Sequence, residues 1–152
     1  MSALQLKSVK DIELEISQEF EIFDSWMDRY EYIIDLGKQL ALFPDEWKIE
    51  ENKVYGCQSQ VWFKTELKND LFVCQAISDS AIVSGLIALL LRIYDQKDPS
   101  DIVETNPTFI SMIGLDEHLS PTRNNGLNVM LKKIKNDARN MVLNQQHKTD
   151  MN

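Results

Sequence analysis

Cysteine, histidine, glycine and proline are all scarce in this chain of 152 residues, which has 2, 2, 5 and 4 of them respectively. A structural zinc site takes four cysteine or histidine ligands at close spacing, and no CxxC pair is present. A metal site could be composed on paper from Cys57, Cys74, His118 and Asp79, but this set contains too few cysteine and histidine ligands. No glycine-rich phosphate loop is present either. We therefore expect neither a metal nor a cofactor in this chain.

Basic residues are the minority charge, and long hydrophobic runs are missing. The 16 basic and 24 acidic residues give a net charge of -8, which repels phosphate backbones and argues against nucleic acid as a partner. The longest apolar run, residues 81–91, is interrupted by Ser84 and Gly85, and a membrane span needs about 20 residues. Residues 1–15 mix charges into their apolar positions, unlike a secretory signal. These absences predict a cytoplasmic protein that does not bind membranes.

What is present is an ordinary globular composition, 43% hydrophobic and 26% charged. This length suits one domain with its own core. We expect a single domain over residues 1–152, with a core from about residue 8 to 143 and a polar, disordered tail at 144–152.

Hydrophobic spacing predicts the elements. Apolar residues recur every three or four positions in 9–23 and 26–40, while 81–93 is apolar nearly all round and 121–143 has one apolar face, so all four predict helices. Asp24 or Ser25 caps the second helix, which ends by Pro44 unless Gly37 frays it sooner, and Ser78 or Asp79 caps the third. Prolines 99, 107 and 121 each follow a polar residue and predict three further helix starts. Alternating β-rich residues predict strands at 53–55, 60–67 and 71–77. The fold class is α+β, a three-stranded antiparallel sheet packed on one side by helices.

The two cysteines differ in setting. Cys74 lies within a predicted strand, where burial is the ordinary state of a free cysteine. If the hairpin turns at Asn69, Cys74 pairs with Lys64, about 23 Å along the strand from Cys57, which excludes a disulfide between them. Cys57 lies in the loop 56–59 with little apolar surface around it, and loops carry function disproportionately. The residues alone leave open whether Cys57 is a reactive thiol or an ordinary loop cysteine.

Three polar residues are candidates for a supporting role beside the Cys57 thiol. His118 and Arg123 flank Ser120 and Pro121 at the start of the last predicted helix, where free N–H groups favour an anion such as a thiolate or persulfide. Alternatively, Arg123 pairs with a surface carboxylate and His118 only caps. Asp79 is interpreted first as a helix cap.

The segment 56–62, GCQSQVW, resembles the active-cysteine signature of the SufE family, the sulfur acceptors of the cysteine desulfurase SufS. Residues 26–40, 81–91 and 118–127 resemble the family's other blocks in the same order, so the resemblance covers about residues 20 to 140. It implies a SufE/IscU-like fold. It also implies that Cys57 takes sulfur as a persulfide from a SufS-like desulfurase, stimulates that enzyme and supplies a SufBCD-like scaffold. The chain is then an accessory protein without a cofactor of its own, and the pyridoxal phosphate belongs to the partner.

By the same resemblance, Arg123 matches the arginine of the family's serine-proline block, and Asp79 matches the second aspartate of its Asp-Ser-Asp block. The sequence departs from the family at Ile77, where the first aspartate of that block is usual, and at Ser84, a position usually basic. These departures concern contacts with the partner rather than the thiol.

Two other functions remain open, as does the choice between monomer and homodimer. A cysteine hydrolase would use Cys57 as nucleophile, His118 as base and Asp79 to orient it. A cluster scaffold normally has four thiolate ligands, and this chain has only two cysteines. For the sulfur-acceptor function we expect Cys57 to be alkylated slowly until a partner docks.

Overall fold

The computed structural model describes residues 7–151, and the side chains of residues 7–146. Its first two helices are α1 (Val9–Phe20) and α2 (Trp26–Gly37). Ser8 caps α1 in a capping box with Asp11, and Ser25 caps α2 by accepting a hydrogen bond from the Asp28 N–H. Both helices are found where the spacing predicts them. Of the two candidate caps Ser25 is the one used, and α2 ends at Gly37, the earlier of its two expected ends.

The sheet is one antiparallel hairpin of β1 (Val61–Lys68) and β2 (Leu71–Ser78). Asn69 and Asp70 have φ angles of 54° and 64°, as in the two-residue hairpin turn whose twist matches the strands. Both turn residues are unpaired, so Cys74 lies opposite Thr65 rather than Lys64. The predicted register was therefore one residue off.

The predicted third strand is wrong, because residues 53–55 do not form one. Lys53 makes an isolated bridge with Trp62, and the Val54 N–H donates to the Val61 carbonyl at 2.9 Å. The short 3-10 helix η3 (Glu50–Asn52) precedes this bridge, and Gly56, with a φ of 97°, follows it. The 3-10 helix and the turn at Gly56 prevent a longer run of strand hydrogen bonds at residues 53–55. A second 3-10 helix, η2 (Asp45–Trp47), lies just before η3.

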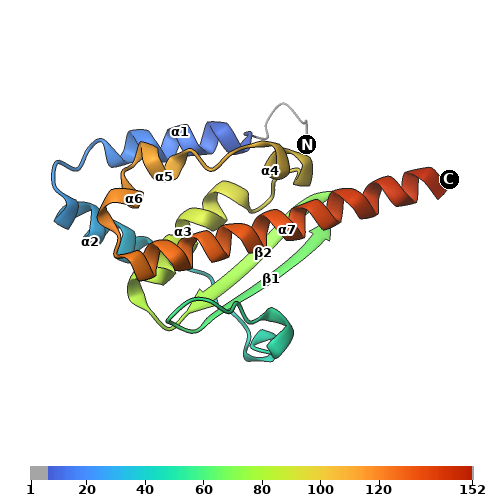
Figure 1. The fold of residues 1–152 in the computed structure, drawn as a ribbon, viewed down its shortest axis with the longest axis horizontal. Coiled ribbons are helices and arrows are strands. Elements are labelled where there is room, and N and C mark those ends of the chain that lie inside the picture. The colour runs from blue at the N-terminus through green and yellow to red at the C-terminus, as the bar shows by residue number, and fades with distance from the viewer. Residues whose placement is uncertain (1–6, 152) are drawn as a thin grey trace.

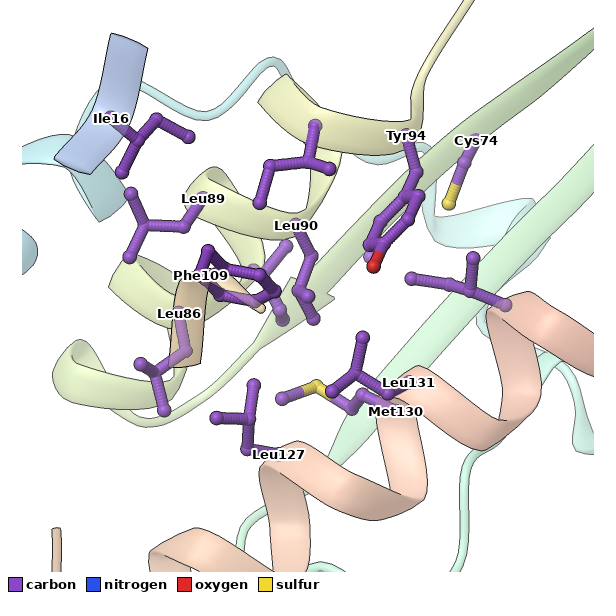
Figure 2. Packing of buried hydrophobic residues seen from close by; sticks show 14 of the residues in the cluster. Ile16, Cys74, Leu86, Leu89, Leu90, Tyr94, Phe109, Leu127, Met130 and Leu131 are labelled. Carbon is purple, nitrogen blue, oxygen red and sulfur yellow. The ribbon is translucent and has the colours of Figure 1, made fainter. Parts of the chain in front are cut away.

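The core surrounds the central helix α3 (Ala81–Tyr94) and includes buried residues from both strands and from the helices packed around them. Ser80 caps α3, not Ser78 or Asp79 as predicted. In Figure 1, α3 and the long helix α7 (Pro121–Met151) lie over one face of the hairpin, and Thr65 of β1 donates a hydrogen bond to Asp137 of α7 at 2.8 Å. Figure 2 shows apolar side chains of α3 and α7 meeting there, with Phe109 beside those of α3. One side of the hairpin is thus covered by helices, as expected.

Three short helices join α3 to α7: α4 (Pro99–Glu104), α5 (Phe109–Met112) and α6 (Leu115–His118). Pro99 begins α4 after its cap Asp98, whereas α5 begins two residues after Pro107, so that proline does not start a helix. Four helices therefore follow α3, not three.

Helix α7 differs from its prediction at its end. It continues through Met151 where a disordered tail was predicted from 144, and its last turns extend past the other elements (Figure 1). Neither proline nor glycine follows Gly126 in α7, so nothing in the backbone chemistry ends the helix earlier.

No helix within residues 7–151 has both the length and the apolar character that crossing a membrane requires.

Candidate functional site

The Cys57 loop, residues 56–59, connects the Lys53 bridge to β1 and packs on the first turns of α7. Gly56 has a φ of 97°, and a Cβ there would lie 3.1 Å from the Val129 side chain of α7. The positive φ favours glycine at this point, and the approach of Val129 leaves little room for a side chain. The half-buried Cys57 thiol donates a hydrogen bond to the Gly126 carbonyl at 3.7 Å. The thiol therefore faces α7.

Hydrogen bonds hold both ends of this loop. Asn125 Nδ2 donates to the Gly56 carbonyl at 3.1 Å, which ties the start of the loop to α7. At the other end, Asp79 Oδ1 accepts from the Gln60 N–H at 3.0 Å, and the Asp79 N–H donates to the Gln60 carbonyl at 3.3 Å. Asp79 thus joins the end of the loop to the end of β2. The sequence interpretation missed the contact of Asn125, whose partner is 69 residues away.

A pocket of about 120 Å³ opens beside Cys57. One wall comes from the start of α3 and another from α7, and the residues that line it are Cys57, Gln58, Ser59, Ser80, Val83, Leu86, Thr122, Arg123, Gly126, Leu127 and Met130. The pocket therefore combines an apolar floor with a thiol and a cation.

Arg123 is the cation of this pocket, and it lies near the start of α7. Its backbone N–H donates to the cap Ser120 at 3.3 Å. Its exposed guanidinium has neither an ion pair nor a hydrogen bond with any residue of the described part of the chain. The surface-carboxylate partner considered from the sequence is thus missing among the side chains of residues 7–146, and the charge is open to a ligand.

The environments of the two thiols differ. Burial raises the pKa of the Cys57 thiol above its ordinary value. Burial is the cause of this shift, and Arg123 does not contribute to it. Cys74 is buried in the core, where desolvation, followed by the charges of Asp95 and Asp137, raises its pKa much further. Both cysteines are free, and the interpretation of Cys74 as a core residue is confirmed.

His118 is not part of the pocket. It ends α6, and its ring stacks on Trp26 with the centroids 4.1 Å apart and the planes 18° from parallel. Its carbonyl accepts a hydrogen bond from the Tyr30 hydroxyl at 2.5 Å. The structure therefore does not bring Cys57, His118 and Asp79 together as a triad. Among the side chains of residues 7–146, no three metal-ligating groups gather in one place, so the arrangement with Cys74 is not assembled either.

The chain is similar to proteins of one family. The family described as "SufE: Fe-S metabolism associated domain" matches residues 14–138. An "Uncharacterized SufE-like protein" of Rhizobium meliloti (strain 1021) is 43% identical over 129 residues, covering 82% of this chain and 92% of the relative. A second protein of that description, from Rhizobium etli, is 42% identical over 130 residues, covering 82% and 88%.

The fold also has a counterpart among solved structures. The solution structure of a hypothetical protein from Thermus thermophilus superposes with a TM-score of 0.72 at 17% identity, covering 87% of this chain and 96% of that one. At this identity the likeness concerns the fold alone. The family match over most of the chain and the two relatives above 40% identity lead to one conclusion: this chain belongs to the SufE family, a family of Fe–S metabolism.

Proposed function

We propose that Cys57 accepts a sulfur atom from a SufS-like cysteine desulfurase, holds it as a persulfide, and passes it to a SufBCD-like scaffold for iron–sulfur cluster assembly. One observation carries the proposal. In a chain of the SufE family, the cysteine that is not buried in the core lies on a loop held at both ends, at the mouth of a pocket that also holds an unpaired arginine.

The transfer is a thiol–disulfide exchange. The Cys57 thiolate attacks the outer sulfur of the desulfurase persulfide, a new S–S bond forms at Cys57 Sγ, and the S–S bond on the desulfurase breaks. The desulfurase cysteine leaves as a thiolate and keeps the electron pair of the broken bond. No oxidant or reductant is consumed, so the step needs neither a metal nor a cofactor on this chain.

The neighbours of Cys57 take supporting roles. Arg123 holds the anionic persulfide by charge, because its guanidinium is unpaired and faces the same pocket. Asp79 and Asn125 fix the two ends of the loop. His118 acts at a distance, since its stacking on Trp26 fixes the chain just before α7.

The direct test is to mix the protein with a SufS-like desulfurase and cysteine and to weigh the intact protein by mass spectrometry. We expect the mass of one added sulfur atom, located at Cys57 by peptide mapping, and a faster desulfurase. Cys57→Ser is expected to abolish both effects. Cys74→Ala is the matched control and is expected to retain both, because Cys74 lies in the core.

Absence of the adduct, or an unchanged desulfurase rate, would refute the proposal. In the same assay Arg123→Gln separates binding of the anion from attack by the thiol. We expect it to lower the yield of the persulfide by about tenfold, which corresponds to the loss of one charge-assisted contact.

A further inference from the structure

The structure with Cys57 as a free thiol does not explain why residue 126 is a glycine. It lies in the sixth position of α7 and is buried. A glycine inside a helix lowers stability by about 1 kcal/mol relative to alanine, a cost that usually reflects a positive φ or a close contact. Gly126 has no positive φ. Its reason must therefore be sought in its surroundings.

The surroundings do not require glycine while Cys57 is a free thiol. A Cβ on Gly126 would lie 3.5 Å from Cys57 Sγ and 3.9 Å from Cys57 Cβ, both ordinary van der Waals distances. The two glycines of the α2–α3 crossing are different, because a Cβ would lie 2.5 Å from backbone at Gly37 and 2.2 Å from backbone at Gly85. The thiol form therefore accommodates alanine at position 126.

The persulfide form changes this result. Its second sulfur is bonded to Cys57 Sγ at about 2.05 Å, so a sulfur directed toward α7 would lie well inside van der Waals distance of a Cβ that is itself 3.5 Å from Sγ. With glycine at 126, that sulfur has room beside the helix backbone, in the pocket whose lining also includes Leu127, Met130 and Arg123.

We infer that Gly126 is a positioning residue for the sulfur carried by Cys57: the missing side chain provides the space in which the second sulfur of the persulfide lies. This inference rests on the proposed function for the source of the sulfur. The thiol already points at this place, since it donates to the Gly126 carbonyl.

The test compares Gly126→Ala with the wild type in both states of Cys57. Persulfide is formed in two ways: by a desulfurase with cysteine, and by inorganic polysulfide, whose sulfur the thiolate attacks with a shorter polysulfide leaving. The lifetime of the persulfide against a fixed concentration of glutathione is then followed by mass spectrometry. Asn128→Ala, on the exposed side of the same helix, is the matched control for helix propensity.

We expect the thiol form of Gly126→Ala to unfold at the same temperature as the wild type or higher. We also expect its persulfide to be lost about tenfold faster, the factor that corresponds to about 1.4 kcal/mol of overpacking. Asn128→Ala is expected to keep the wild-type lifetime.

Two results would overturn the inference. One is an equal persulfide lifetime in Gly126→Ala and the wild type. The other is a thiol form of Gly126→Ala that unfolds at lower temperature, because glycine would then serve the resting fold. A polysulfide-loaded protein that behaves as expected while the desulfurase adds no sulfur would refute the proposed function and support the role of Gly126.

Discussion

At Cys57, two local interactions favour the protonated thiol. Partial burial penalises the thiolate, and the S–H group donates to the Gly126 carbonyl, a bond that only the protonated form makes. The unpaired Arg123 guanidinium in the same pocket favours an anion, yet burial still raises the pKa of Cys57. In the free protein, the protonated thiol is thus the favoured form, and it lies near the positive charge of Arg123, which favours an anionic persulfide.

This balance predicts slow alkylation of Cys57 by iodoacetamide in the folded protein. Only the thiolate reacts, and a pKa above the ordinary value lowers the thiolate fraction near neutral pH by about tenfold for each unit. The rate, measured by mass spectrometry across a pH series, should rise at higher pH than the rate for the same protein unfolded in urea. Cys57→Ser identifies any signal from Cys74. Folded-state labelling as fast as in urea would contradict the prediction, whereas faster labelling on adding desulfurase agrees with it.

At the scale of elements, the contact between α2 and α3 depends on two glycines. A Cβ on Gly85 would lie 2.2 Å from the Ile33 carbonyl oxygen, and a Cβ on Gly37 would lie 2.5 Å from the Gly85 nitrogen. Because the opposing atoms are backbone, neither clash can be relieved by rotating a side chain. The first turns of α3 carry pocket residues, so this crossing also places one wall of the site.

Gly85→Ala is therefore expected to destabilise the protein by about 3 kcal/mol or more, the upper range for overpacking. Urea unfolding followed by circular dichroism measures this change. The thiol form of Gly126→Ala is the matched control, since it adds the same methyl group to a helix glycine without a close contact. A Gly85→Ala protein as stable as the wild type would show that the helices separate at little cost.

The helices and strands also show which features can be predicted from the sequence. The periodicity of α1 and α2 depends on neighbours within a few residues and was predicted correctly, and the cap of α2 was narrowed to Asp24 or Ser25. The third strand was not, because its length depends on η3 and on the turn at Gly56 rather than on β propensity. In the site, the family signature identified Cys57, but the anchoring of the loop by Asn125 and the stacking of His118 on Trp26 join segments far apart in the chain. No local pattern reports such contacts.

For the whole molecule, buried and half-buried polar contacts join α1 and α7 to the short helices between α3 and α7. Glu13 of α1 is 1% exposed, and its Oε2 accepts from the Phe109 N–H at the start of α5 at 2.9 Å. The ammonium group of Lys135 in α7 donates to the carbonyls of Ile102 and Thr105 around the end of α4. Glu13 Oε1 and the Tyr94 hydroxyl are buried without a partner among the described residues. A carboxylate on an amphipathic helix was not recognisable from sequence as part of the core.

Glu13 gives the protein a pH-dependent stability with a defined sign. Desolvation raises its pKa, although the Phe109 and Thr108 hydrogen bonds and the charge of Lys135 act in the opposite direction. As pH rises above the ordinary glutamate range, the unfolded chain loses the Glu13 proton before the folded protein does. The unfolded state then binds fewer protons, so the contribution of Glu13 to the free energy of unfolding falls with increasing pH until the folded carboxyl has also ionised.

We therefore expect the difference in unfolding free energy, wild type minus Glu13→Gln, to fall between pH 4 and 7. Glutamine stays neutral and retains an oxygen for the Phe109 N–H, so the difference isolates ionisation of Glu13 from every other titrating group. Urea unfolding at several pH values measures it. Glu21→Gln, an exposed carboxylate at the end of α1, is the control and should show no comparable trend. A difference that rises with pH would mean that the Phe109 N–H and Lys135 outweigh burial, making the ionised carboxylate the favoured form in the core.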